Sequence, residues 1–228
     1  MWPVDPIFSS SFSSALWLAT PGRDFYEGKC YIYQTIPDIW IFTMFQAITG
    51  LFKKSPYQRS AQLVYTKMVE QARTPYFYRN LGVADNLDGR FDMICLHLYL
   101  VLDRLENEPQ ASEMAQNMVN YMISDVDRNF REMGVGDMSV GKKVKKLAAA
   151  LYGRLEAYQV AGDKISVDSG AAFEDALCRN IYRSDDHGDL PLASLRQYVD
   201  QQKQFLAALN IEDLLQGNIT FWHCGEFV

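Results

Sequence analysis

Hydrophobic residues recur at helical spacing along most of the chain from Ser55 onward. Apolar residues three and four positions apart share one face of a helix, so each such stripe predicts one helix. The stripes predict helices over about 57–72, 87–105, 115–133, 139–158, 166–182 and 191–209, followed by a short turn at 211–216. Neither a strand-like alternation nor an internal repeat interrupts them. The pattern predicts an all-α fold, a single helical bundle domain of about six to eight helices.

Proline, glycine and a capping residue mark the expected ends of these helices. Pro75 lacks an amide hydrogen and should stop the first helix. Gly134 and Gly136 should end the helix that follows Pro109, because glycine is the usual residue just past a helix C-terminus. Ser139 is the expected N-cap of the next helix, which we expect to end before Gly162.

The first forty or so residues mix proline, serine and aromatic residues without a sustained period. Residues 39–52 are uncharged but too short to cross a bilayer, which needs about 20 apolar residues. They could lie on a membrane or dock onto the domain. We therefore expect residues 1–43 to be a poorly ordered extension and residues 44–228 to be the helical domain. Met44 is a candidate start of the chain, and a genuine extension is the alternative.

Charge is distributed unevenly along the chain, whose formal net charge is -6. Residues 53–154 carry fifteen Lys or Arg against twelve Asp or Glu, whereas residues 156–228 carry five against twelve. A basic middle can face phosphate or anionic lipid, but the acidic last third would be repelled by both. The balance argues against a generic nucleic-acid binder, and we expect no DNA partner.

Cysteine and histidine provide no metal or catalytic pattern. The four cysteines are widely spaced and form no CxxC pair, which argues against a disulfide framework or a zinc site. His97 lies in the segment 93–102, which is apolar nearly all round and predicts the central, most buried helix. Cys95 is two residues away and cannot share a helix face with His97. We expect His97 to be a core residue, and we expect no catalytic residue, metal or cofactor.

A near match to a phosphate-binding loop runs from Gly136 to Lys142, with the pattern G-x-x-x-x-G-K. Phosphate binding there needs a preceding strand and a Ser or Thr hydroxyl directly after the lysine. The hydroxyl position is Lys143 and the preceding segment is predicted to be helical. We interpret the glycines as a corner between two helices.

A basic face is predicted on the helix that begins near Ser139. Lys142, Lys145 and Lys146 lie opposite its apolar stripe, with Lys143 and Arg154 at the border of the buried face. A solvated polar face is the usual explanation of such a run. However, no acid lies between residues 139 and 155, and unpaired positive charge attracts polyanions such as lipid headgroups or ribosomal RNA.

Charged residues of both signs surround the start of the central helix. Asp85 or Asn86 can cap that helix, and acidic residues in its first turn complement the helix dipole. Arg90 is expected to pair with Asp125 or Asp127 if the two helices are neighbours. Such networks are more often structural than catalytic. The same interpretation applies to the charged residues that precede the glycine corner, namely Asp127, Arg128, Arg131 and Glu132.

Two long blocks carry a resemblance to a known family. They are LGVADNLDGRFDM at 81–93 and REMGVGD at 131–137, the second continuing through the lysines into LAAALYGRLEAY. Together they resemble the ubiquinol-cytochrome c chaperone family, over about residues 44–182. The motif positions that the resemblance implies as structural are Asp85, Asp88, Gly89, Asp92, Asp127, Arg128, Arg131, Glu132, Gly134, Gly136, Asp137, Gly141, Tyr152 and Gly153.

The resemblance implies an all-α, non-enzymatic chaperone that binds newly made cytochrome b during assembly of complex III, the ubiquinol-cytochrome c reductase. Mitochondrial members of the family are associated with the ribosome and act with a small partner protein. The segment before residue 44 is not Arg-rich as a mitochondrial transit peptide would be. We therefore expect a bacterial chain, cytoplasmic and peripheral to the inner membrane; a eukaryotic chain would lie on the matrix side of the mitochondrial inner membrane.

Partner-binding residues are expected on the basic face and near Pro75, where three aromatic residues offer apolar surface. The candidates are Lys142, Lys143, Lys145, Lys146, Arg154, Tyr76, Phe77, Tyr78 and Arg90. Expected partners are cytochrome b and a ribosome or an anionic membrane surface. The alternative function is a helical lipid- or quinone-binding module, which would enclose an apolar cavity between its helices rather than expose a basic face.

Overall fold

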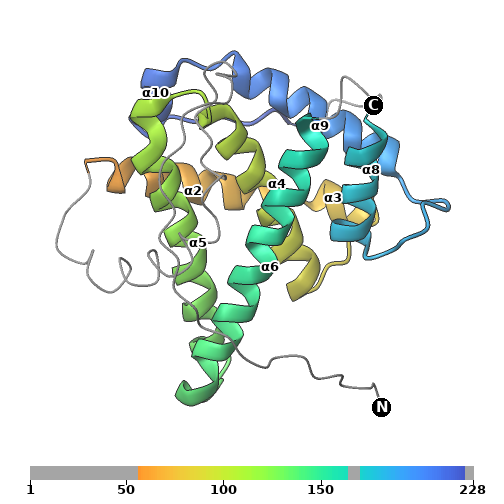
Figure 1. The fold of residues 1–228 in the computed structure, drawn as a ribbon, viewed down its shortest axis with the longest axis horizontal. Coiled ribbons are helices and arrows are strands. Elements are labelled where there is room, and N and C mark those ends of the chain that lie inside the picture. Colours follow the sequence, from red (N-terminus) through yellow and green to blue (C-terminus); the bar gives the residue numbers. More distant parts are fainter. Residues whose placement is uncertain (1–55, 164–169, 224–228) are drawn as a thin grey trace, which may run out of the picture.

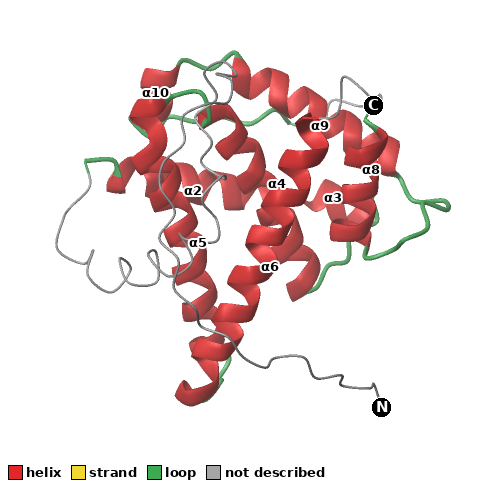
Figure 2. Ribbon diagram, viewed as in Figure 1, coloured by secondary structure: helices red, strands yellow, loops and turns green. Residues whose placement is uncertain are grey.

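The structure is a computed structural model that describes residues 56–163 and 170–223, and the regular elements in these ranges are all helical (Figure 2). The all-α prediction is confirmed. The expected extension, residues 1–43, and the apolar segment 39–52 lie outside the described residues. The α-helices are α2 (Gln58–Ala72), α3 (Pro75–Arg79), α4 (Leu87–Leu105), α5 (Ser112–Glu132), α6 (Asp137–Asp163), α8 (Ala171–Leu177), α9 (Leu192–Ala207) and α10 (Ile211–Leu215).

Helix α4 is the centre of the bundle, as its sequence predicts (Figure 1). It packs against α2, α5, α6 and α9, and every residue from Asp92 to Leu102 is buried. Its first turn is capped by Asn86, whose side chain accepts a hydrogen bond of 2.8 Å from the backbone N–H of Gly89. A helix that is apolar on all sides is stable only when neighbours cover all of them, and the surrounding helices do so.

Helices α5 and α6 form a long antiparallel hairpin whose far end extends beyond the rest of the bundle (Figure 1). Near the bundle, α5 buries Met114, Met118 and Met122, and α6 buries Leu151 and Leu155. Toward the tip, from residue 123 to residue 150, Val140 alone is buried among these described residues. The tip is thus exposed on most sides.

The C-terminal part of the described chain returns across the bundle. After α8, the segment Cys178–Tyr182 forms one π-helical turn, and α9 then packs on α4. Residues 217–223 lie beside α2, where Lys67 donates a hydrogen bond to the carbonyl of Ile219 and Gln71 donates one to the carbonyl of Trp222. These contacts attach the end of the described chain to its first helix.

Three helix boundaries differ from the sequence prediction. Pro75 does end α2 but also begins α3, because proline is well suited to the first position of a helix. Helix α6 begins at Asp137, two residues before the expected N-cap Ser139, and runs through Gly162 to Asp163. A Cβ atom on Gly162 would lie 2.7 Å from the Tyr99 hydroxyl, so this glycine permits close packing rather than ending the helix.

The helix expected over 166–182 is also shorter than predicted. Residues 164–169 lie outside the described part, and α8 begins at Ala171 after Gly170, whose φ is +89°. That backbone conformation favours glycine and marks the N-terminal end of α8.

His97 is a core residue, as expected, and lies in a buried hydrogen-bond network. Its Nδ1 is 2.8 Å from the Met93 carbonyl, which can only accept, so Nδ1 carries the proton. Nε2 then accepts from the Tyr198 hydroxyl at 2.7 Å, and Gln71 donates to the same hydroxyl oxygen at 3.3 Å. The network connects α2, α4 and α9 through a neutral imidazole.

This buried imidazole makes stability depend on pH. Burial lowers the pKa of His97 from 6.5 to about 4, so between these values the unfolded chain binds a proton that the folded chain does not. We expect the contribution to the free energy of unfolding to be complete above pH 6.5 and to fall by about 3 kcal/mol as the pH decreases to 4. Urea unfolding at several pH values across this window should show that the free energy of unfolding depends less steeply on pH in His97→Gln than in the parent protein. Substitution of the exposed His187 by glutamine is the control. If the pH dependence of the free energy of unfolding is the same in His97→Gln as in the parent, His97 is not the group responsible.

Candidate functional site

A buried ion cluster connects the two blocks of the sequence motif. Asp92 on α4 is 0% exposed and pairs with Arg154 of α6 at 2.7 Å and with Arg183 at 3.1 Å. Arg183 also reaches Asp88 at 2.8 Å. Burial raises the pKa of Asp92, and the two guanidinium groups counteract part of that rise. The cluster fixes α6 and the segment after the π-helical turn to the start of the central helix.

Arg183 was not predicted to belong to this cluster. It follows the π-helical turn with a φ of +56°, in the left-handed region that residues other than glycine adopt rarely. Arg183 and Asp92 are 91 positions apart, and an isolated arginine at the end of a helix gives no periodic signal. The pairing of Arg183 with Asp92 is evident only from the path that the chain takes between α8 and α9.

The expected pairing of Arg90 is wrong. Arg90 pairs with Asp85 at 2.8 Å, in the loop before α4, and both side chains are more than half exposed. Asp125 and Asp127 instead pair within α5, with Arg128 and Arg131 respectively. Of the two predicted capping residues, the structure uses Asn86, which leaves Asp85 free to hold Arg90.

The glycine corner between α5 and α6 is confirmed, and a helix rather than a strand precedes it. Gly134 has a φ of +76°, as expected of the glycine that ends a helix. Arg131 bridges the corner, since it pairs with Asp127 at 2.7 Å and with Asp137 of α6 at 2.9 Å. Glu132 is exposed at the end of α5. The pattern that resembles a phosphate-binding loop therefore builds a turn between two helices.

The lysines of α6 form an exposed face close to this corner. Lys142, Lys145 and Lys146 are exposed, as predicted, and Lys143 lies over the ring of Phe130 at 5.5 Å from its centroid. Arg154 does not belong to the face, because its guanidinium is in the buried ion cluster. Gly141 and Gly153 are exposed on the same helix, and Tyr152 is half-buried.

The aromatic residues after Pro75 are mainly structural. Phe77 is fully buried and packs edge-on against Tyr198 and His97, at centroid distances of 4.8 and 5.4 Å. Its proposed role in an exposed surface is therefore wrong. Tyr76 and Tyr78 are half-buried, and the Tyr78 hydroxyl donates to the Ala72 carbonyl at 2.9 Å.

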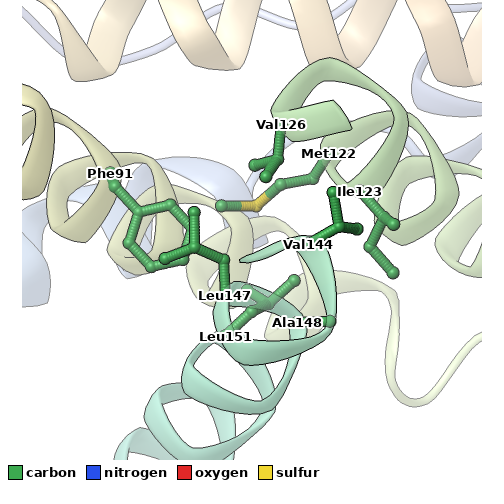
Figure 3. A pocket seen from close by; sticks show the side chains of 8 residues that line it. All are labelled: Phe91, Met122, Ile123, Val126, Val144, Leu147, Ala148 and Leu151. Atoms are coloured by element: carbon green, nitrogen blue, oxygen red, sulfur yellow. The ribbon is translucent and has the colours of Figure 1, made fainter. Parts of the chain in front are cut away.

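An apolar cleft lies where α4, α5 and α6 meet (Figure 3). Most of the side chains that line it are only partly buried, so they present apolar surface to solvent. The cleft itself holds about 10 Å³, room for about one water molecule. Its lining residues are Phe91, Met122, Ile123, Val126, Val144, Leu147, Ala148 and Leu151. Periodicity in α5 and α6 identified most of these positions as apolar, but not that they form a shared, partly open surface.

Among the described residues, no group of three or more His, Cys, Asp or Glu is arranged to hold a metal ion. In the same ranges, no helix combines the length and the hydrophobicity needed to cross a membrane. The described part of the chain offers a helical scaffold, a small apolar cleft and a basic hairpin, features suited to binding another macromolecule.

Comparison with known proteins assigns this scaffold to a class of assembly chaperones. The family described as "Ubiquinol-cytochrome C chaperone" matches residues 79–221, which is more than half of the chain. The chain belongs to this family. The match extends beyond residue 182, where the expected resemblance ended, and it therefore includes Arg183 and α9.

Individual relatives agree with the family match. The chain is 26% identical over 172 residues to ubiquinol-cytochrome-c reductase complex assembly factor 1 of Xenopus laevis, covering 75% of this chain and 84% of that protein. It is 28% identical over 177 residues to the Mus musculus protein of that name, of which it covers 59%. The crystal structure of the Cbp3 homolog from Brucella abortus superposes with a TM-score of 0.63 at 32% identity, covering 80% of this chain and 97% of that one.

Proposed function

We propose that this chain is a non-enzymatic chaperone that binds newly made cytochrome b and holds it for assembly into complex III. The observation that carries the proposal is the family match over residues 79–221, which includes the ion cluster, the hairpin and the apolar cleft. The relatives in frog and mouse are named as assembly factors of the same reductase complex. The protein would act from the membrane surface, peripheral to the membrane that holds its client.

The apolar cleft is the proposed contact for the client. A newly made membrane subunit exposes apolar helices until its partners cover them, and a chaperone needs apolar surface to shield them. Ile123, Val126 and Val144 provide such surface and remain partly exposed. The ion pair between Asp92 and Arg154 joins α4 to α6 at one end of this cleft. It therefore fixes the positions of these two helices, which line the cleft together with α5.

A quinone-binding module is the less favoured function. Pockets for ligands of drug-like size generally have volumes of about 300–1,000 Å³, whereas the cleft between α4, α5 and α6 holds about 10 Å³. A groove of about 310 Å³ between α6 and α8 is larger, but it is open. Its lining residues are Gly153, Glu156, Ala157, Val160, Ala161, Ala172 and Arg179. This lining offers no aromatic side chain that could stack on a quinone ring.

Affinity purification of the tagged protein from solubilised membranes tests the function. We expect cytochrome b to copurify, and we expect deletion of the gene to lower cytochrome b and assembled complex III while other respiratory complexes remain near normal. Membrane proteomics and reduced-minus-oxidised haem spectra measure the second result. Normal cytochrome b levels under growth conditions that require complex III would refute the proposal.

A pair of variants tests the client surface separately. Val126→Ser combined with Val144→Ser makes the cleft more polar and should reduce the copurified cytochrome b severalfold, because apolar contact area is lost. Val160→Ser is the control, since Val160 is 48% exposed on α6 but does not line the cleft. Equal recovery of cytochrome b with the double variant and the control would exclude the cleft as the contact.

A further inference from the structure

The tip of the α5–α6 hairpin exposes two methionines. Met133 follows the last residue of α5 and is 50% exposed, and Met138 is the second residue of α6 and is 96% exposed. Single exposed apolar residues are common on soluble proteins. Here two of them flank one tight turn at the end of a projecting hairpin (Figure 1), where no described residue covers them.

The exposed methionine of α6 is aligned with the lysine face. Residues four and seven positions apart lie on one side of a helix, so Met138, Lys142 and Lys145 share a side. At 1.5 Å per residue, Lys142 lies about 6 Å and Lys145 about 10 Å along the axis from Met138. The end of the hairpin therefore exposes an apolar side chain, Met138, with the positive charges of Lys142 and Lys145 farther from the tip on the same side of α6.

Nearby acids only partly offset this charge. Residues 127–146 contain six Lys or Arg and three Asp or Glu. Asp127 and Asp137 both pair with Arg131, and Glu132 is the remaining acid, exposed at the end of α5. No acid follows Asp137 until Glu156, so the lysines face solvent with excess positive charge.

We propose that this hairpin tip inserts into an anionic lipid surface. Interfacial segments bury their apolar residues about 5–10 Å into the boundary between headgroups and acyl chains. If Met133 and Met138 occupy that boundary, the axial spacing places Lys142, Lys145 and Lys146 at the level of the lipid phosphates. A polyanion such as RNA would match the charge but would leave both methionines exposed, so the combination favours lipid. The proposal goes beyond the chaperone function, since it requires no client.

Sedimentation with vesicles tests the proposal. We expect the full chain to bind vesicles of phosphatidylglycerol and phosphatidylcholine but not vesicles of phosphatidylcholine alone. Each lysine near an anionic surface contributes roughly a fivefold gain in partitioning, so K142E/K145E/K146E should weaken binding by at least about a hundredfold. M133S/M138S keeps the charge and should weaken binding by at least about tenfold, because apolar burial is lost.

Two control variants make the same chemical changes elsewhere. R59E/R73E/R79E reverses three exposed charges on α2, on α3 and between them, and L87S/V160S removes two exposed apolar side chains, with Leu87 67% exposed. Both should bind vesicles as the parent does, with helical circular dichroism retained in all four variants. Losses in the controls equal to those of the tip variants would overturn the proposal. So would unchanged binding by M133S/M138S, or binding to RNA without binding to anionic vesicles.

Discussion

Replacing Asp92 by alanine is expected to lower the free energy of unfolding by about 3 kcal/mol. The substitution leaves the guanidinium of Arg154, whose side chain is 16% exposed, without its partner in the interior. Arg183 is less affected, because it is half exposed and keeps its pair with Asp88. The cost therefore comes mainly from a buried, unpaired positive charge on α6. Chemical denaturation at neutral pH measures it.

Two further variants separate the ion cluster from general effects of mutation. Asp85→Ala removes an exposed pair with Arg90, which water and salt screen, and should therefore destabilise the protein much less than Asp92→Ala does. The double variant Asp92→Ala with Arg154→Ala removes both charges and should cost less than the sum of the two single changes. If Asp92→Ala is no more destabilising than Asp85→Ala, the cluster contributes little to the stability of the bundle.

Much of the fold could be predicted because its helices repeat their apolar residues at regular spacing. The central helix is the clearest example, since the apolar run around His97 can be stable only when it is surrounded. Boundaries were less predictable where a residue type has two uses. Pro75 ends one helix and begins another. Gly162 does not end α6; it lies inside the helix, where the lack of a side chain makes room for the Tyr99 hydroxyl.

The site was predicted where its residues are neighbours in sequence and missed where they are distant. The lysine face follows from helical geometry within one helix, and the structure exposes it as expected. Arg154 was grouped with those lysines by its charge, but a partner on another helix makes it structural. Arg183 completes the same cluster from 91 positions away, a distance over which no periodic pattern extends.

Replacing Gly89 by alanine should destabilise the protein by about 3 kcal/mol, although alanine favours helices more than glycine does. A Cβ atom on Gly89 would lie 2.0 Å from the Ala84 carbonyl oxygen, which belongs to the backbone and cannot rotate away. Relief would require the loop before α4 to move, and that loop holds the cap from Asn86 to the Gly89 N–H. Overpacking and the loss of a cap each cost on the order of 1–2 kcal/mol.

Gly153→Ala is the matched comparison for Gly89→Ala. The same chemical change occurs on α6, where nothing apart from the adjoining residues and the helix's own backbone lies within 4 Å of the added Cβ. There only the helix propensity acts, and the free energy of unfolding should rise by roughly 0.5–1 kcal/mol. The two substitutions should thus shift the thermal unfolding midpoint in opposite directions. A rise in the midpoint of Gly89→Ala would show that the loop yields easily, and the close approach of Ala84 would then not be the reason for glycine at this motif position.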